Sequence, residues 1–253
     1  MIGVIIQARM SSTRLPGKVM KTIENKTILN HIVEQLSNSK VLKKIVIATS
    51  KNTDDDIIES HSHELGVACF RGDLSNVLER HYLCAKQFSF DPIVRIPSDK
   101  PLIDPVVVDE VIEKFYKTES DYISNFIYPL KYNIGTEVEV FSFNALEKAS
   151  KLARKSFEKE HIFPFFHHNK NIFKINFVSN LNDISHLRFP LDRKEDLKLI
   201  NVIFSNIKKR PILKQDILNL YNQNPNLFSI NKKIDPNEGQ IRSLKNEMSR
   251  YYK

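Results

Sequence analysis

The feature that most constrains the fold is a regular alternation of strand-like and helix-like segments in the first half of the chain. Short β-branched apolar runs, which are typical of buried strands, are each followed by a segment with apolar residues at helical spacing. The strand-like runs are 2–6, 45–50, 67–70 and 93–96, and the helix-like segments are 27–36, 54 onward, 77–85 and 107–116. Thr27 is expected to be the N-cap of the first of these helices. This order predicts an α/β fold with a doubly wound, mostly parallel sheet.

The second half of the chain departs from this order. Residues 136–141 and 172–178 alternate strictly between apolar and polar side chains, which is typical of strands with one apolar face. We expect them to lie outside the central sheet, in a small inserted β/α arm within about 136–190. Further helices are expected at 143–155, 158–167, 193 to about 207 and around 217–221. The expected domains are 1–210, which contains the arm, and a C-terminal helical extension and tail at 211–253.

Composition limits the class of protein. The 253 residues are enough for one large α/β domain, and 41% hydrophobic and 27% charged residues are ordinary for a globular protein. Cys69 and Cys84 lack a paired spacing motif, which argues against a disulfide framework or zinc site and favours a cytoplasmic location. No membrane span or targeting segment is expected. The net charge of +8 is spread along the chain, which favours anionic small molecules over nucleic acid as partners.

The loop after the first strand has the composition of an anion-binding site. Residues 7–18 contain Arg9, Arg14 and Lys18, together with three hydroxyl side chains and a Pro-Gly turn. In an open α/β sheet, ligands bind beyond the carboxyl ends of the strands. The three cations are therefore placed to neutralise a triphosphate, with loop amides as neutral donors. The alternative is a solvated basic turn, since the glycine pattern matches neither the P-loop nor the dinucleotide-binding fingerprint.

Asp99 is the candidate metal ligand. It follows the strand at 93–96 and lies between Pro97 and Pro101, which would hold it on a stiff turn. Nucleotide enzymes commonly bind magnesium through one or two carboxylates plus phosphate oxygens. The alternative is an aspartate that only stabilises a turn or a helix end. Asp104, which precedes a proline, has the pattern of such a helix N-cap.

Other polar residues have simpler structural explanations. The aspartates at 54–56 suit the first turn of a helix better than a metal site, because no strand end fixes them. Asp192 precedes a helix-like segment, as an N-cap does. The pair His167-His168 lacks the spacing of a helical metal pair. Glu137 and Glu139, on an alternating segment, are expected to face solvent unless a site covers them.

The order of these motifs and their amino-acid sequences resemble those of a known family. The run Ile5-Ile6-Gln7-Ala8-Arg9-Met10-Ser11-Ser12-Thr13-Arg14-Leu15-Pro16-Gly17-Lys18 is similar to the signature of cytidylyltransferases that make CMP-activated acidic sugars, such as CMP-Kdo and CMP-sialic acid synthetases. The most similar subgroup is the spore-coat-polysaccharide type. Further matches, in the same order, are Ile47-Ala48-Thr49-Ser50, Phe70-Arg71-Gly72, Asp99-Lys100-Pro101-Leu102-Ile103-Asp104, Glu137-Val138-Glu139-Val140-Phe141, Glu160-His161 and Leu191-Asp192 through Glu195-Asp196-Leu197. The resemblance covers residues 1–207.

The resemblance implies an enzyme that moves CMP from CTP to a sugar hydroxyl and releases pyrophosphate, on a nucleotide-diphospho-sugar-transferase-like fold of Rossmann type. It implies Mg²⁺ as the cofactor, and it reassigns Asp192 from a helix cap to a second metal ligand beside Asp99. The implied catalytic residues are Arg9, Lys18 and Asp99, the nucleotide-binding residues are Ala8, Arg9, Arg14, Lys18 and Arg71, and the acceptor-side residues are Glu137, Glu139 and His161.

The resemblance also implies a homodimer. In the resembling synthetases an arm crosses to a second subunit, so an isologous interface would bury the apolar residues Ile172, Phe173, Ile175 and Phe177 or their neighbours. The alternative is that the helix around Leu218 covers these residues within one chain.

The chain departs from the family pattern in two motifs. Subgroup members usually carry Thr-Gly-Asp-Cys-Pro where this chain has Pro97-Ser98-Asp99-Lys100-Pro101, and Arg-Glu-His where it has Lys159-Glu160-His161. Asp99 and His161 are retained, and Lys100 places a cation beside the expected metal ligand. Two other classes stay open: a glycosyltransferase that consumes a nucleotide sugar, for which an Asp-x-Asp motif is expected, and a non-catalytic nucleotide-binding relative in polysaccharide assembly.

Overall fold

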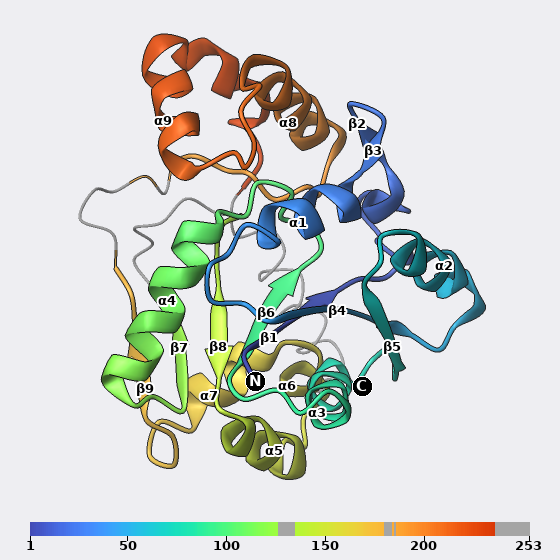
Figure 1. Cartoon of the computed structure of the whole chain (residues 1–253), viewed down its shortest axis with the longest axis vertical. Helices are drawn as coiled ribbons and strands as arrows, with labels where there is room; N and C mark the ends of the chain where they lie inside the picture. The colour runs from blue at the N-terminus through green and yellow to red at the C-terminus, as the bar shows by residue number, and fades with distance from the viewer. Residues whose placement is uncertain (126–134, 180–183, 185, 236–253) are drawn as a thin grey trace, which may run out of the picture.

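A seven-stranded sheet forms the centre of the molecule, with the strand order β5-β4-β1-β6-β8-β7-β9 (Figure 1). The computed structural model describes residues 1–125, 135–179, 184 and 186–235. The strands of the sheet are β1 (Gly3–Gln7), β4 (Lys44–Ser50), β5 (Ala68–Gly72), β6 (Ile93–Pro97), β7 (Tyr122–Ser124), β8 (Glu139–Phe141) and β9 (Ile175–Phe177), and β2 (Thr22–Ile23) pairs with β3 (Lys26–Thr27) in a separate small hairpin. β8 runs antiparallel to both of its neighbours, and the other pairs in the sheet are parallel.

Helices cover both faces of this sheet, which confirms the doubly wound arrangement. They are α1 (Ile28–Leu36), α2 (Asp56–Glu64), α3 (Val77–Gln87), α4 (Pro105–Thr118), α5 (Phe143–Leu152), α6 (Ser156–Glu160), α7 (Ile162–His168), α8 (Lys194–Asn206) and α9 (Lys214–Gln223), with 3-10 turns η1 (Lys18–Met20), η2 (Thr53–Asp55) and η3 (Pro225–Asn231). Along β1, Val4 and Ile6 pack into a first core with α1, α4, α8 and α9, whereas Ile5 packs into a second core with α3, α5 and α7. Within the described residues, no helix has the length and apolarity needed to cross a membrane.

Local signals identified two helix starts correctly and one incorrectly. The Thr27 side chain accepts a hydrogen bond from a backbone amide in the first turn of α1, and Asp104 does the same for α4. Asp192 does not cap α8, so that prediction from the residues alone is wrong. The cap position is Arg193, and the Asp196 carboxylate accepts a hydrogen bond from the Arg193 amide at 2.9 Å.

The prediction that the two alternating segments lie outside the central sheet is also wrong. β8 lies between β6 and β7, and β9 continues the sheet beyond β7. Their apolar residues pack against neighbouring strands and helices of the same chain, and Phe173 is buried in the second core. The alternation identified strands, but the partners of each strand are distant in sequence and the alternation does not specify them.

The helix expected at 158–167 is broken into α6 and α7. The break is at His161, whose φ of −117° and ψ of 94° correspond to extended backbone. The break places His161 between the two helices.

The C-terminal segment contacts α1 through Phe204 of α8 and through the loop between α8 and α9. Figure 1 shows α8 and α9 together at one end of the molecule, beyond α1. The side chain of Gln35 donates hydrogen bonds to the carbonyls of Ile103 and Ile212 at 2.9 and 2.7 Å and accepts one from the Ile212 amide at 2.9 Å. The helix predicted around Leu218 is α9, and Phe228 of η3 joins the same first core. This core is on the opposite face of the sheet from the core around β9, so α9 does not cover β9.

Two buried histidines are expected to make the protein less stable at acid pH. Burial lowers the pKa of His31, and it lowers the pKa of His81 further below its ordinary value. His81 donates from Nδ1 to the Val77 carbonyl at 2.8 Å, and its Nε2 has no partner among the described residues. Protonation at Nε2 would therefore bury an unpaired charge.

The sign of the effect follows from proton binding. Below about pH 6.5 the unfolded chain binds protons at these imidazoles while the folded chain does not, so the free energy of unfolding should fall as the pH drops from 7 to 5. The limiting slope is about 1.4 kcal/mol per pH unit for each histidine that stays neutral when folded. Urea unfolding at several pH values measures it. His81→Gln should reduce the slope, with the exposed His63→Gln as the control. An unchanged slope in His81→Gln would contradict this prediction.

Candidate active site

The candidate site lies at the carboxyl ends of the central strands. β1 and β6 are parallel and adjacent, with Gln7 opposite Pro97. The loop at 8–17 and the turn that carries Asp99 therefore leave the sheet at the same edge, as expected for a ligand site in an α/β fold. The Ser98 amide donates to the Gln7 carbonyl at 3.0 Å and fixes the two segments side by side.

Backbone hydrogen bonds fold the loop back toward the strand end. The Met10 carbonyl accepts from the Gly17 amide at 3.1 Å. Gly17 has a φ of +63°, a left-handed conformation that glycine adopts at little steric cost. Asp55, which is 2% exposed, accepts from the Met10 amide at 2.7 Å and from the Ser50 amide at 3.2 Å. One of the three aspartates expected at a helix start therefore also anchors the loop to the end of β4.

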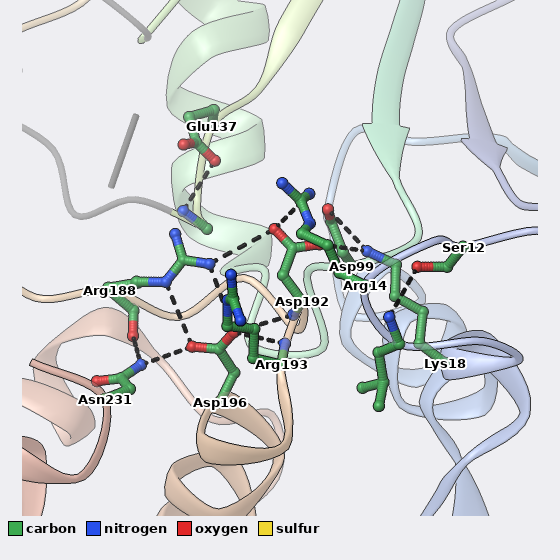
Figure 2. A network of polar contacts seen from close by, with 12 residues as sticks. Ser12, Arg14, Lys18, Asp99, Glu137, Arg188, Asp192, Arg193, Asp196 and Asn231 are labelled. Carbon is green, nitrogen blue, oxygen red and sulfur yellow. Dashed lines mark hydrogen bonds and ion pairs between the residues drawn. The ribbon is translucent and has the colours of Figure 1, made fainter. Parts of the chain in front are cut away.

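Lys18 lies between the two predicted metal ligands. Its Nζ is 3.2 Å from Oδ2 of Asp99 and 2.8 Å from Oδ1 of Asp192. Figure 2 shows the Lys18 side chain directed at these two carboxylates. The Leu191 amide donates to the Asp99 carbonyl at 2.8 Å, which brings the segment before α8 beside the turn after β6. The fold thus joins three residues that the sequence separates by up to 174 positions.

Two arginines complete the charge balance around Asp192. Arg14 Nη2 is 2.8 Å from Asp192 Oδ2, and Arg188 Nη2 is 3.5 Å from the same oxygen. Burial opposes ionisation of Asp192, but the cations of Lys18, Arg14 and Arg188 outweigh it and hold the pKa of this carboxyl below its ordinary value. Asp192 is therefore ionised at neutral pH.

The two carboxylates have the donor chemistry that the expected magnesium ion requires. Asp99 and Asp192 both direct a carboxylate oxygen at one cation, the Lys18 ammonium, so the site can hold positive charge between them. Within the described residues, no group of three or more His, Cys, Asp or Glu side chains could hold a metal by itself. A site with two carboxylates requires further oxygen ligands, and phosphate oxygens and water are the ligands that Mg²⁺ usually takes there.

A second cluster surrounds Arg95 at the same edge of the sheet. Because β8 is antiparallel, its first residue, Glu139, lies opposite Arg95 at the carboxyl end of β6. Arg95 pairs with the Glu139 carboxylate and donates to Gln7 Oε1 at 2.9 Å, and the Tyr122 hydroxyl donates to Glu139 Oε1 at 3.1 Å. Burial and the Glu139 charge raise the pKa of Tyr122 above its ordinary value, so the phenol stays protonated. Glu139 is thus covered by the site and does not face solvent.

His161 and Arg9 border this second cluster. Burial lowers the pKa of His161, with Arg95 and Arg9 adding to the effect and Glu160 and Glu139 opposing it. The imidazole is therefore neutral at pH 7 and can accept a proton. Arg9 is 3.7 Å from Glu160, and its side chain is 37% exposed, which leaves the guanidinium accessible to a ligand.

Lys100 pairs with Glu137 in the structure. Its Nζ donates to the Glu137 carbonyl at 2.7 Å and is 2.9 Å from the Glu137 carboxylate. This pair ties the turn after β6 to the segment before β8. The positive charge of Lys100, the residue that departs from the family pattern, is thus balanced by the Glu137 carboxylate. Glu137 in turn pairs with this lysine instead of facing solvent.

Arg71 and Ala8 stay predictions as nucleotide-binding residues. Arg71 is on β5 and pairs with the side chains of Asp56 and Glu59 on α2, at 2.6 and 2.9 Å. It borders an open cavity of about 600 Å³ between β5 and α3 but makes none of the contacts in the Lys18 cluster that the structure describes. Ala8 is buried at the start of the loop, where its amide donates to the Ala48 carbonyl at 3.1 Å.

Arg95 and Arg188 contact the site residues but could not be identified from the sequence, and Arg80 is a further buried cation on α3. Arg95 lies in the strand-like run at 93–96, and that pattern does not indicate which partner the arginine contacts. Arg188 lies in a short alternating stretch at 187–192, which does not indicate its partners either. Arg80 is fully buried on α3, with Nη1 donating to the Asp73 carbonyl at 3.0 Å and with Nε and Nη2 unpaired among the described residues. Burial lowers the pKa of Arg80 to about 10, so it remains a cation at neutral pH. A charged residue on the apolar stripe of a helix was the one available signal.

Comparisons with known proteins show which family the chain resembles. The family described as cytidylyltransferase matches residues 3–234. The spore coat polysaccharide biosynthesis protein SpsF of Bacillus subtilis is 31% identical over 229 residues, which are 87% of this chain and 94% of that protein. A cytidylyltransferase structure from Leptospira borgpetersenii has a TM-score of 0.86 at 31% identity and covers 90% of this chain and 96% of its own. The 3-deoxy-manno-octulosonate cytidylyltransferase of Solibacter usitatus is 36% identical over 110 residues, which are 43% of this chain and 42% of that protein.

Proposed function

Since the chain belongs to the cytidylyltransferase family, we propose that it transfers CMP from CTP to a hydroxyl of an acidic sugar, with Mg²⁺ as the cofactor and pyrophosphate as the second product. Such an activated sugar would serve the synthesis of a surface polysaccharide or glycan. The acidic acceptor is proposed because a relative over part of the chain is named for an octulosonate, a sugar acid. The free thiols of Cys69 and Cys84 suit the cytoplasm, which we propose as its location.

The observation that carries this proposal is the Lys18 ammonium between Asp99 and Asp192, with Arg14 beside it. Carboxylates hold Lys18 and Arg14 at the site, so both cations are already close to where phosphate oxygens would bind. Such prior positioning is the main contribution that a protein makes to nucleotidyl transfer, which needs no covalent intermediate. When bound by Asp99 and Asp192, Mg²⁺ would neutralise phosphate charge and favour departure of pyrophosphate.

The Arg95 cluster is proposed as the acceptor side. Arg9 and Arg95 supply positive charge toward an acidic sugar, and Glu137 and Glu139 keep the charge of this region balanced. In the reaction, the acceptor oxygen forms a bond to the α-phosphorus of CTP, the bond from that phosphorus to pyrophosphate breaks, and the hydroxyl proton must leave. His161 is neutral at pH 7, so it is proposed as the acceptor of that proton.

Nucleotide preference gives a direct test that needs no sugar. CTP with Mg²⁺ should raise the melting temperature more than GTP, UTP or ATP does. At equal concentration, the ligand with the lowest dissociation constant for the folded state stabilises that state most. Differential scanning fluorimetry at equal nucleotide concentrations measures the four shifts. Equal shifts for all four nucleotides would remove the preference for cytidine.

We further propose that the protein is a homodimer. Phe173 cannot contribute as predicted, because it is 5% exposed and packs on the Phe166 ring at a centroid distance of 4.7 Å within its own chain. The proposal therefore rests on β9, the last strand of the sheet in the described part of the chain, where Ile175 and Phe177 remain partly exposed. An open strand edge with apolar side chains is a surface that proteins usually cover.

Sedimentation equilibrium at micromolar concentration tests the dimer. The mass should be twice that of the chain, and Phe177→Lys should shift the equilibrium toward monomer by placing a charge at the covered edge. A monomer mass together with full activity would contradict the dimer and leave the acceptor side to one subunit.

A further inference from the structure

One buried carboxylate organises the segment that carries Asp192. Asp196 is fully buried, and its Oδ2 accepts hydrogen bonds from the Asp192 amide at 3.0 Å and the Arg193 amide at 2.9 Å. The Arg188 guanidinium donates to both of its oxygens, at 3.3 and 3.4 Å. Asp196 therefore fixes the backbone of Asp192 and also the arginine that contacts the Asp192 side chain (Figure 2).

A residue of the C-terminal segment completes this arrangement. Asn231 is 3% exposed, and its Nδ2 donates to Asp196 Oδ1 at 2.9 Å and to the Arg188 carbonyl at 3.0 Å. It reaches these groups from 35 and 43 residues farther along the chain, so the contact is not part of the capping of α8. The segment is anchored by Phe228, which is 7% exposed and whose ring lies 6.2 Å from the Phe189 ring.

We infer that Asn231 is a positioning residue for the metal site and that the C-terminal segment is needed to hold Asp192 in place. This inference rests on the proposed role of Asp192 as a magnesium ligand. Asn231 does not touch the metal position; it acts through Asp196 and Arg188, which set the backbone and one charged neighbour of Asp192. Hydrogen bonds that orient a metal ligand commonly change metal affinity by about 10- to 100-fold when they are removed.

The test is the affinity for Mn²⁺ in the presence of CTP and without any sugar, measured by electron paramagnetic resonance. We expect Asn231→Ala to raise the dissociation constant of Mn²⁺ about 10-fold. The matched control is Asn226→Ala, at an exposed position of the same segment, which should bind Mn²⁺ as the unmodified protein does. In an Asp192→Asn background, Asn231→Ala should not change the dissociation constant of Mn²⁺ further. A general loss of stability would instead weaken Mn²⁺ binding in both backgrounds.

The possible outcomes separate this inference from the proposed function. If Asp192→Asn weakens Mn²⁺ binding and Asn231→Ala does not, Asn231 is not a positioning residue, although the metal site stands. If neither variant weakens binding, Asp192 is not a ligand and both proposals fail. If Asn231→Ala weakens Mn²⁺ binding equally in the unmodified and the Asp192→Asn backgrounds, the inference is also overturned. If Asn231→Ala is too unstable, Asn231→Gln applies the same test, because it keeps a buried amide but moves its nitrogen by one methylene group.

Discussion

Replacing Asp99 or Asp192 by Asn is expected to lower turnover by roughly two to three orders of magnitude while the protein stays folded. Asparagine keeps the shape of aspartate but removes the negative charge that holds Mg²⁺. In Asp192→Asn, the cations of Lys18 and Arg14 also lose their shared carboxylate, which lies 2.8 Å from each of them. Steady-state rates of pyrophosphate release, with circular dichroism as the check on folding, measure the effect.

The matched control for charge removal is Asp54→Asn. Asp54 is exposed near the start of α2 and makes none of the described site contacts, so its replacement should leave turnover within about twofold of the original rate. If Asp192→Asn retained near-normal turnover, its carboxylate would not be a metal ligand. The network around it would then serve only to hold the segment before α8.

Lys18→Met should have an effect of similar size on turnover, about 100-fold, because a cation positioned for phosphate oxygens is lost. It should also change how the free protein responds to Mg²⁺. Without the ammonium, Asp99 and Asp192 face each other with one fewer counterion, and the protein should be less stable in the absence of metal. Mg²⁺ alone should then raise the melting temperature of Lys18→Met more than that of the unmodified protein, in which Lys18 occupies the position between the carboxylates.

Scanning fluorimetry with and without Mg²⁺ measures this difference, and Lys21→Met is the control for loss of a nearby lysine. A similar magnesium response in Lys18→Met and in the unmodified protein would show that the two carboxylates do not share one cation position.

The first half of the fold could be predicted from the sequence because its signals are local. Alternating β-branched and amphipathic segments gave β1, β4, β5 and β6 with their helices, and Thr27 and Asp104 marked helix starts. In the second half, the predicted position of the strands was wrong, because it depends on partners that are distant in sequence. The alternation around Glu139 indicated a strand with a polar face, but Arg95 and Tyr122, which bury that face, are on other strands.

The candidate site shows the same limit. Asp192 has the local pattern of a helix cap. Its side chain can contact Lys18 instead, because Asp196 accepts the hydrogen bonds from the backbone amides at the start of α8. Only the family resemblance assigned Asp192 to the metal. Nothing in the sequence indicated that Asn231 would contact Asp196, since a single buried asparagine in a polar segment has no pattern of its own.

The most direct test of the central claim is pyrophosphate release from CTP and Mg²⁺ with a panel of acidic sugars, in which octulosonic and nonulosonic acids are included. We predict release that requires both CTP and one acidic sugar, together with formation of the CMP-sugar. Cleavage of a supplied nucleotide sugar instead would indicate a glycosyltransferase. Binding of CTP without pyrophosphate release for any sugar, under conditions in which the protein is folded and bound to Mg²⁺, would contradict the account and leave a nucleotide-binding protein without this catalysis.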